Sequence, residues 1–298
     1  MLKFMKNTIR LIMAMAIGLT LAAPVTFAQQ DIFIDFGRGP EAVHLPPQIE
    51  SEEPLPLVMM LHGYGSSALL TDIYLGFTAE ADRRGFILIK PNGRVDVFGN
   101  RFWNATPACC QYFGESNDSA YLRRVIDTLA QRFAIDEGRI YVTGHSNGGF
   151  MSHRMACDHA DRIAAIAGIA GATWADPGAN CTPSEPVAAL QIHGTADFTI
   201  LYNGGCLAGL GCYPSARFSA YSWAVLNGCD LVPDTAEEQR DFTTGGAGEE
   251  TTLQAYPNCD AGGAAALWTL TAGGHVPAFT SEFLPAMVDF LYSHEKAQ

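Results

Sequence analysis

Basic residues are scarce in this sequence. Its 298 residues include 18 Lys+Arg against 31 Asp+Glu, which gives a formal net charge of −13. A nucleic-acid-binding surface needs clustered Lys and Arg to neutralise phosphates, so the sequence predicts no nucleic-acid partner. Charged residues of both signs make up only 16% of the chain, whereas hydrophobic residues make up 48%. This balance excludes an intrinsically disordered chain and favours a folded protein with a sizeable core.

Long apolar runs are also absent after the first thirty residues. Before that point, Met1–Arg10 is basic without any acidic residue, and Leu11–Ala23 is almost wholly apolar. Thr26-Phe27-Ala28 then offers the small residues that signal peptidase requires. Residues 1–28 are therefore predicted to be a secretory signal peptide. The alternative is an uncleaved membrane anchor, for which this run is short, because a spanning helix needs roughly 20 apolar residues.

No internal repeat and no Pro-rich or Ser/Thr-rich linker divides the rest of the chain. Residues 29–298 are therefore predicted to form a single domain that is exported without a stable membrane anchor. The sequence leaves open whether the destination is the extracellular space or the periplasm, and it leaves the oligomeric state open as well.

The cysteines form neither paired CxxC motifs nor a group with closely spaced histidines, so the sequence predicts no zinc site. In an exported chain, an even number of cysteines instead indicates disulfide bonds. Cys206 and Cys212 are expected to close a short local loop. The adjacent Cys109 and Cys110 are expected to bond to two different partners, because a disulfide between neighbours strains the peptide between them. The eight cysteines are Cys109, Cys110, Cys157, Cys181, Cys206, Cys212, Cys229 and Cys259.

Short apolar segments alternate along the chain with segments of helical spacing. The apolar segments lack strict alternation, as expected of strands that are covered on both faces. They are Leu57–Leu61, Phe86–Ile89, Arg139–Thr143, Ile163–Ile169, Val187–Ile192 and Ala264–Leu270. The helical segments are a helix capped at Asn117-Asp118-Ser119 and ending near Ala134, and Phe150–Asp158, Ser215–Leu226 and Ser281–Ser293. This alternation predicts an α/β fold, with a mostly parallel sheet and helices on both faces.

Two other segments do not follow this pattern. As a strand, Asp31–Phe36 would place Ile32, Ile34 and Phe36 on one face and mixed residues on the other, which predicts an edge or antiparallel strand. Thr235–Thr252 is polar and rich in glycine, and it is predicted to be a loop.

The sequence Gly-His-Ser-Asn-Gly-Gly at Gly144–Gly149 follows the predicted strand Arg139–Thr143 and precedes the predicted helix Phe150–Asp158. It matches the G-x-S-x-G nucleophile elbow, a sharp strand-to-helix turn that exposes a serine hydroxyl. Glycines flank the serine because larger side chains would clash within the tight turn. Ser146 is therefore the predicted nucleophile. The alternative is that this glycine-rich turn between strand and helix has only a structural role in packing.

A nucleophilic serine needs a base and a group that orients the base. In the fold that carries this elbow, the acid and then the histidine follow the serine along the chain. Asp197 follows one predicted strand within His-Gly-Thr-Ala-Asp, and His275 follows the last predicted strand within Gly-Gly-His. Ser146, Asp197 and His275 are therefore predicted to form a catalytic triad, with Asp176 as a competing acid.

An oxyanion hole is expected from two backbone N–H groups, one after the nucleophile and one after an early strand. Asn147 and Tyr64 occupy these positions, and His62 is expected to brace the loop rather than to react. Tyr64 and Trp103 are also predicted to contact substrate, as aromatic side chains beside the nucleophile. For Trp103 the alternative is a place in the core. Asn203–Tyr213, which follows closely on Asp197, is a candidate for a wall of the site.

Taken together, these motifs resemble the secreted polyhydroxybutyrate depolymerase and feruloyl esterase family from about Phe33 to Leu291. The motifs are Leu-His-Gly-Tyr-Gly, Trp-Asn with the Cys109-Cys110 pair, Gly-His-Ser-Asn-Gly-Gly, His-Gly-Thr-Ala-Asp and Gly-Gly-His. The resemblance implies an α/β-hydrolase fold, hydrolysis of carboxylic esters by Ser146, Asp197 and His275, and a disulfide between Cys229 and Cys259. It implies no metal and no organic cofactor.

The chain departs from this family in two respects. Many relatives carry a tryptophan two residues after the catalytic histidine, where this chain has Pro277, so the acyl specificity of relatives does not transfer. The sequence also ends at Gln298 without a polymer-binding module, which favours soluble or amorphous esters over crystalline polymer. Feruloyl or acetyl esters, hydroxyalkanoate oligomers and polyesters all fit the machinery as substrates. A peptidase, an acyltransferase or an inactive carbohydrate- or polymer-binding relative are the alternative functions.

Overall fold

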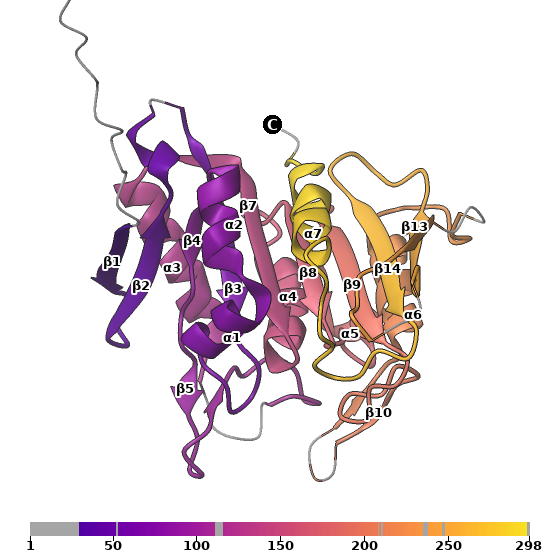
Figure 1. Ribbon diagram of the computed structural model, residues 1–298. Coiled ribbons are helices and arrows are strands. Elements are labelled where there is room, and N and C mark those ends of the chain that lie inside the picture. Colours follow the sequence, from indigo (N-terminus) through magenta and orange to yellow (C-terminus); the bar gives the residue numbers. More distant parts are fainter. Residues whose placement is uncertain are drawn as a thin grey trace, which may run out of the picture.

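The computed structural model describes residues 30–51, 53–110, 116–207, 209, 211–234, 238–245 and 248–296. The predicted signal peptide lies outside these residues. Within them, a ten-stranded sheet carries helices on both faces (Figure 1). This arrangement confirms the predicted α/β class. The strand order across the sheet is β1-β2-β4-β3-β7-β8-β9-β14-β13-β12.

The centre of the sheet is parallel, because β4, β3, β7, β8, β9 and β14 pair in the same direction. The strands of this sheet are β1 (Gln30–Asp35), β2 (Pro40–Leu45), β3 (Leu55–Leu61), β4 (Ile87–Ile89), β7 (Ile135–His145), β8 (Ala165–Ile169), β9 (Ala188–Gly194), β12 (Glu238–Arg240), β13 (Thr251–Tyr256) and β14 (Ala264–Leu270). Two short hairpins stand apart from it: β5 (Arg94–Val95) with β6 (Arg101–Phe102), and β10 (Gly205–Cys206) with β11 (Cys212–Tyr213).

Helices cover the sheet on two sides. They are a short 3-10 helix (Pro47–Glu50), α1 (Ala68–Leu75), α2 (Phe77–Arg84), α3 (Asp118–Arg132), α4 (Asn147–Asp158), α5 (Pro177–Asn180), α6 (Ala216–Leu226) and α7 (Phe283–Tyr292). The predicted cap is present, since the Asn117 side chain accepts a hydrogen bond from the Ala120 N–H at the start of α3. Helices α1 and α2 are not among the predicted helices. Apolar residues lie on both the buried and the exposed face of α1, which leaves no helical period, and α2 is only 8 residues long.

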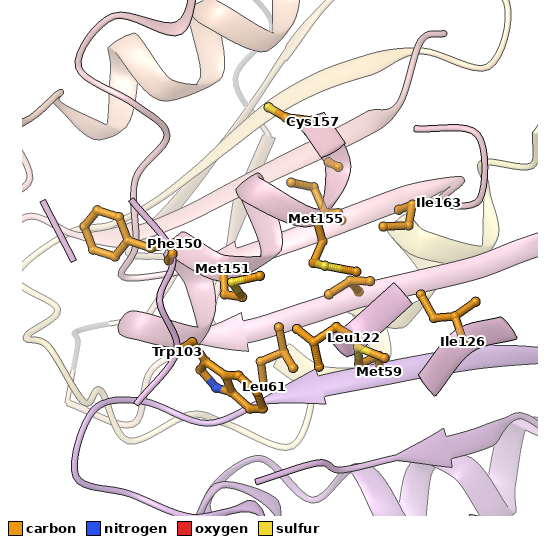
Figure 2. Close-up of a cluster of buried hydrophobic side chains, with 14 of the residues drawn as sticks. Met59, Leu61, Trp103, Leu122, Ile126, Phe150, Met151, Met155, Cys157 and Ile163 are labelled. Carbon is orange, nitrogen blue, oxygen red and sulfur yellow. The ribbon is translucent and has the colours of Figure 1, made fainter. Parts of the chain in front are cut away.

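The core has two layers, one on each face of the sheet. Every residue of β3 is buried, and its side chains alternate between the layers. Leu57, Met59 and Leu61 pack with side chains of α3, α4 and α6. Figure 2 shows part of this layer. Val58 and Met60 pack instead with side chains of α1, α2 and α7. Because both faces are buried, the sequence of the strand is apolar throughout.

The edges of the sheet agree with one prediction and correct another. Strand β1 is an antiparallel edge strand, as predicted, and it buries Ile34 while Phe33 is 70% exposed. The segment Thr235–Thr252 is not only a loop, because it contains the edge strand β12 and the start of β13. All three side chains of β12 are exposed, so the strand carries no apolar pattern that a sequence could reveal.

All eight cysteines are paired. Cys206 bonds to Cys212 and Cys229 bonds to Cys259, as expected, and Cys157 bonds to Cys181. The expectation for Cys109 and Cys110 is wrong, because these neighbours bond to each other. The other six cysteines pair among themselves, so they leave no other partner for Cys109 or Cys110. The peptide bond between Cys109 and Cys110 is cis, and their Cα atoms are 3.1 Å apart.

The two disulfides of the C-terminal half are expected to differ in their contribution to stability. Cys229 and Cys259 are 30 residues apart in the chain, whereas Cys206 and Cys212 are 6 apart. Loop-closure entropy grows with this separation, so replacing the first pair by serine should lower the free energy of unfolding by about 3.6 kcal/mol, and the second by about 2.2 kcal/mol. Urea unfolding of the two double variants tests this order. A larger loss from the shorter loop would contradict it.

Candidate active site

Ser146, Asp197 and His275 come from three loops at one edge of the sheet. Ser146 lies between β7 and α4, Asp197 follows β9, and His275 follows β14. These strands run parallel across the sheet, with β8 between β7 and β9. The loops after them therefore meet at the carboxyl ends of the strands, where α/β sheets bind their ligands.

The turn at Ser146 depends on close packing of backbone on backbone. Ser146 has a φ of 56°, a left-handed conformation that side chains rarely adopt. A Cβ atom on Gly144 would lie 2.5 Å from the carbonyl carbon of Gly148, and one on Gly148 would collide with the carbonyl group of Leu61. The first turn of α4 thus contacts the sheet directly, as a nucleophile elbow requires.

The three side chains are within hydrogen-bond distance of one another. Nε2 of His275 lies 2.9 Å from Oγ of Ser146, and Nδ1 of His275 lies 2.8 Å from Oδ2 of Asp197. Oδ1 of Asp197 accepts hydrogen bonds from the backbone N–H groups of Thr199 and Ile200, both at 2.8 Å. The competing acid, Asp176, is instead an exposed residue that caps α5.

Asp197 is a buried carboxylate that stays ionised. Burial raises the pKa of Asp197, but the hydrogen bonds from His193 and His275 outweigh this effect and bring the pKa well below its usual range. A carboxylate in this state can fix the orientation of the His275 ring and stabilise the imidazolium that forms when His275 takes a proton.

A chain of buried hydrogen bonds leads from α6 and α4 through two side chains of β9 to Asp197. The Trp223 indole N–H can only donate, and it donates to Nδ1 of His153 at 2.8 Å. Nε2 of His153 therefore carries the proton and donates to Oε1 of Gln191 at 2.9 Å. The Gln191 amide then donates to Nδ1 of His193 at 3.2 Å. This fixes the tautomer of His193, whose Nε2–H points at the Ile200 carbonyl oxygen (2.7 Å) and at Oδ2 of Asp197 (3.3 Å).

Sequence reasoning assigned no role to this chain of residues. Gln191 and His193 alternate with Ile192 in a strand in which every residue is buried. Two polar residues on one face of a buried strand were the available signal, since side chains two apart share a face.

Two further histidines hold the loops of the site. His62 donates from Nδ1 to the Gly63 carbonyl oxygen (2.8 Å) and accepts at Nε2 from the Gly93 N–H (2.9 Å). His62 thus braces the loop that carries Tyr64, as expected. His145 donates from Nε2 to the carbonyl oxygen of His275 at 2.7 Å. Burial lowers the pKa of both histidines to about 4, so both are neutral near pH 7.

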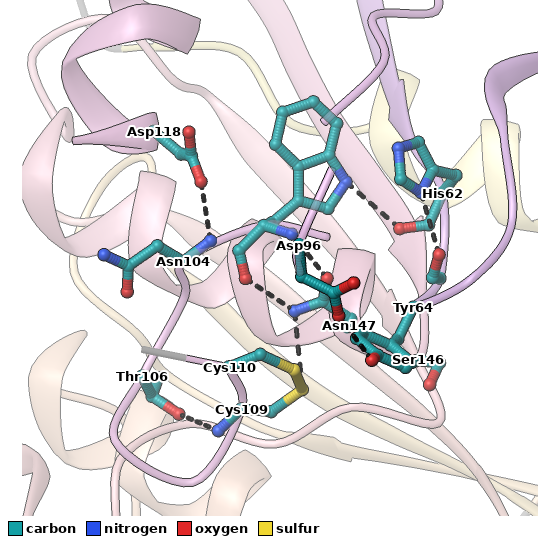
Figure 3. The surroundings of a disulfide bond; sticks show 12 residues. His62, Tyr64, Asp96, Asn104, Thr106, Cys109, Cys110, Asp118, Ser146 and Asn147 are labelled. Atoms are coloured by element: carbon teal, nitrogen blue, oxygen red, sulfur yellow. Dashed lines mark hydrogen bonds between the residues drawn. A yellow bond between two sulfur atoms is a disulfide. The ribbon is translucent and has the colours of Figure 1, made fainter. Parts of the chain in front are cut away.

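Of the two residues predicted to supply the oxyanion N–H groups, Asn147 directly follows Ser146, and Tyr64 lines the same cavity as Ser146. Asn147 is the first residue of α4, where backbone N–H groups have no partner within the helix and the helix dipole is positive. Its side chain is held by Trp103, accepting from the backbone N–H at 2.7 Å and donating to the carbonyl oxygen at 2.8 Å, and it also donates to Sγ of Cys109 (Figure 3). On the other side, Gly63 approaches so closely that a Cβ there would lie 3.3 Å from Cβ of Ser146.

The prediction that Trp103 contacts substrate is wrong. Its side chain is fully buried in the core, and its indole N–H donates to the His62 carbonyl oxygen at 3.1 Å. Trp103 instead connects the loop of Tyr64 with Asn147. A tryptophan in a loop has the same sequence signature in either role, so the sequence alone could not decide between the site and the core.

A cavity of about 330 Å³ opens above Ser146. Its lining residues are Gly63, Tyr64, Ser66, Leu70, Thr71, Tyr74, His145, Ser146, His275 and Val276. No Asp, Glu, Lys or Arg is among these described residues. The described part of Asn203–Tyr213 does not line the cavity either, so its predicted role as a wall is not supported; it forms the β10–β11 hairpin. Tyr64 does line it, and its hydroxyl donates to Oδ2 of Asp96 at 2.6 Å.

Across the described ranges, no cluster of three or more His, Cys, Asp or Glu side chains could hold a metal ion. A search of the same part of the chain finds no helix that is both long and apolar enough to span a membrane.

Comparisons with known proteins agree with this architecture. The family model of phospholipases and carboxylesterases matches residues 48–208. The chain is 29% identical over 239 residues to feruloyl esterase B of Piromyces equi, covering 78% of this chain and 42% of that protein. It is 25% identical over 219 residues to poly(3-hydroxyalkanoate) depolymerase C of Paucimonas lemoignei, covering 61% and 52%. The chain thus spans about half the length of these relatives.

Among solved structures, the acetyl xylan esterase from Aspergillus awamori superimposes with a TM-score of 0.60 at 16% identity, covering 88% of this chain and 99% of that one. The fold is that of an α/β-hydrolase. Within that class, the chain belongs to the phospholipase/carboxylesterase family.

The hydrogen-bond chain makes His193 a positioning residue for Asp197. Replacing His193 by Leu removes a donor to a charged acceptor, which should lower kcat on an ester substrate about tenfold or more and leave KM nearly unchanged. Trp223→Phe is the matched control at the other end of the hydrogen-bond chain. It removes the indole donor to His153 but leaves His193 beside Asp197, so it should lower kcat much less than His193→Leu does. Steady-state kinetics test both variants. Equal losses in the two variants, or a change confined to KM, would contradict the positioning role.

The buried histidines should make folding sensitive to acid. Burial lowers the pKa values of His62, His145 and His153 to about 4, whereas a free imidazole titrates near 6.5. Between these values the unfolded chain binds more protons than the folded one, so stability falls as the pH falls. At pH 5 each histidine should cost about 2 kcal/mol relative to pH 7.5. Urea unfolding at the two pH values tests this, and His153→Gln should reduce the difference by about a third. A free energy of unfolding that does not change would contradict the prediction.

Proposed function

We propose that this protein is a secreted serine esterase that hydrolyses carboxylic esters through an acyl-enzyme on Ser146. The observation that carries the proposal is the continuous hydrogen-bond geometry from Ser146 through His275 to Asp197. This geometry opens into an uncharged cavity that suits an ester. Membership of a carboxylesterase family supports ester rather than amide substrates.

The first half-reaction forms the acyl-enzyme. Oγ of Ser146 attacks the ester carbonyl carbon while Nε2 of His275 takes the hydroxyl proton, and Asp197 stabilises the resulting imidazolium. The negative charge that develops on the carbonyl oxygen is stabilised by the backbone N–H groups of Tyr64 and Asn147. The tetrahedral intermediate then expels the alcohol, which leaves with the proton from His275. Ser146 is left as an ester of the acyl group.

The second half-reaction releases the acid. A water molecule gives its proton to Nε2 of His275 and attacks the acyl carbon of the Ser146 ester. Collapse of the second intermediate returns the proton to Oγ of Ser146 and frees the carboxylic acid. No step requires a metal or an organic cofactor.

Export is part of the same proposal. Residues 1–28 act as a signal peptide, and residues 29–298 form the catalytic domain. Four disulfides support an oxidising destination, since such bonds persist outside the cytosol. Among substrates, feruloyl and acetyl esters of polysaccharides and hydroxyalkanoate esters are supported by the names of relatives, which include a feruloyl esterase and a depolymerase.

Ser146→Ala should abolish ester hydrolysis without unfolding the protein. The variant keeps a Cβ at the strained turn and loses only the nucleophilic oxygen, so kcat on p-nitrophenyl butyrate should fall by about 10⁴-fold or more. Circular dichroism and the thermal midpoint should stay at their wild-type values. A matching amide, p-nitrobutyranilide, should be hydrolysed far more slowly than the ester by the wild type. Retained esterase turnover in the Ser146→Ala variant would refute the proposal.

A further inference from the structure

A second cavity, also of about 330 Å³, shares no lining residue with the cavity above Ser146. Its wall comes from the turn between β1 and β2, the start of β2, the segment after β4 and the β5–β6 hairpin. In Figure 1 this hairpin lies at the lower end of the sheet, on the side of β1 and β2. This second cavity is called the arginine cavity below. The charged and amide residues of its lining are Arg38, Glu41, Asn92, Arg94 and Arg101.

Three arginines line the arginine cavity, although the whole chain has only 18 Lys+Arg. Arg38 is paired with the buried Asp118 at 2.6 Å, so its charge is balanced. Arg94 and Arg101 form no ion pair with any residue that the structure describes. The cavity is therefore lined by two arginines whose charge has no carboxylate beside it.

Glu41 is the one acidic residue among the described residues that line the arginine cavity. Its side chain is buried and accepts a hydrogen bond from the side chain of Asn92 at 3.1 Å. Burial raises the pKa of Glu41, while the hydrogen bond from Asn92 and the positive charges of Arg101 and Arg38 oppose that rise. The guanidinium groups of these two arginines thus act on the same space as Glu41. One carboxylate cannot balance both Arg94 and Arg101, so about one positive charge is left over.

Hydrogen bonds fix the wall of the arginine cavity to the loop between β3 and α1. The Gly93 N–H donates to Nε2 of His62 at 2.9 Å. The carbonyl oxygen of Arg101 accepts from the Gly65 N–H at 2.9 Å, and the side-chain oxygen of Asn92 accepts from the first N–H of α1 at 3.1 Å. A ligand that binds here therefore meets a wall whose backbone is already ordered, which lowers the entropic cost of binding.

The charges of the lining select the chemistry of a ligand. A positively charged hollow attracts an anion, and the planar donors of a guanidinium group match the two oxygens of a carboxylate. One positive charge in excess suits a monoanion. Inorganic phosphate carries more negative charge near neutral pH, and Glu41 would repel the additional charge. The cavity above Ser146, by contrast, has no Asp, Glu, Lys or Arg among its described lining residues, so it offers a carboxylate no such counter-charge.

We propose that the arginine cavity is a second binding site, which takes a carboxylate between Arg94 and Arg101 and beside Glu41. Two sources can supply this chemistry: a free carboxylic acid, such as ester hydrolysis releases, or the carboxylate of an acidic sugar. The site goes beyond the proposed function and does not depend on it, because a carboxylate is bound here without being changed.

Titration calorimetry of the wild-type protein near pH 7 tests the ligand chemistry with butyrate, glucuronate and inorganic phosphate. Low salt is used, because salt screens charges that are partly exposed. At least one of the two carboxylates should bind more tightly than phosphate. Tighter binding of butyrate identifies a free acid as the source, and tighter binding of glucuronate identifies an acidic sugar. Failure of both carboxylates to bind would overturn the site, and tightest binding of phosphate would overturn its assignment to a carboxylate.

Variants of the lining should change the affinity in opposite directions. Arg94→Gln and Arg101→Gln should each raise the Kd of the carboxylate about tenfold or more, because each removes a charged hydrogen-bond donor. Arg94 is exposed, and its side chain makes no hydrogen bond with the residues that the structure describes, so its loss leaves the fold intact. Glu41→Gln should lower the Kd about threefold, because it removes a like charge but keeps an oxygen for Asn92. Weaker binding in the Glu41→Gln variant would contradict the proposal.

Arg132 offers a matched control. It is exposed at the end of α3, close to Ala134, whose carbonyl oxygen accepts from the N–H of Leu55 at the start of β3. The arginine cavity lies beyond the other end of the sheet, after β4, which runs parallel to β3. Arg132→Gln removes the same charge from the protein and should leave the Kd unchanged within about twofold. Equal weakening by Arg94→Gln and Arg132→Gln would indicate a general effect of net charge and overturn the proposal.

The site and the proposed function fail in different measurements. Carboxylate binding that is unchanged in both the Arg94→Gln and the Arg101→Gln variants refutes the site and leaves the esterase proposal untouched. A wild-type protein that hydrolyses no ester refutes the proposed function, whereas binding of a carboxylate that depends on Arg94 and Arg101 would still support the site.

Discussion

The close approach of α4 to the sheet is the constraint on which the rest of the site depends. Gly144 and Gly148 let backbone contact backbone between β7, α4 and the end of β3. Ser146 stands at this contact with a left-handed φ, directly before the first residue of α4. The loop of Gly63 also lies against Ser146. In the proposed mechanism, the nucleophile and the oxyanion N–H groups would therefore be positioned by the main chain, and no flexible side chain would have to be ordered when a substrate binds.

Neutral histidines secure the loops that surround this turn. His62, His145 and His193 each lie at or just beyond the end of a strand, and each donates one N–H to a loop carbonyl oxygen. Through these bonds they hold the loop of Tyr64, the backbone of His275 and the segment after Asp197. A neutral imidazole suits this task, because it satisfies a buried carbonyl without placing a second charge near the carboxylate of Asp197.

Much of this could be predicted from the sequence, and the exceptions have physical reasons. The parallel strands were visible because burial on both faces makes them apolar, and Ser146, Asp197 and His275, which the structure brings within hydrogen-bond distance, could be singled out because each follows such a strand. The burial of Trp103 depends on contacts with residues that are distant in the sequence. The bond between Cys109 and Cys110 depends on geometry that is unusual for neighbouring residues. Local sequence patterns contain neither kind of information. Helix α1 was missed because both of its faces are apolar, so it has no helical period to detect.

The triad residues and much of the wall of the cavity above Ser146 come from different segments of the chain. Ser146, Asp197 and His275 stand on loops after β7, β9 and β14, whereas Leu70, Thr71 and Tyr74 of α1 line the cavity. Helix α1 is also short and connects to the next helix at Gly76. Substitutions at the residues of α1 that line the cavity, Leu70, Thr71 and Tyr74, are therefore expected to change which esters reach Ser146. In this architecture, a single exchangeable helix gives evolution or design a route to new substrates.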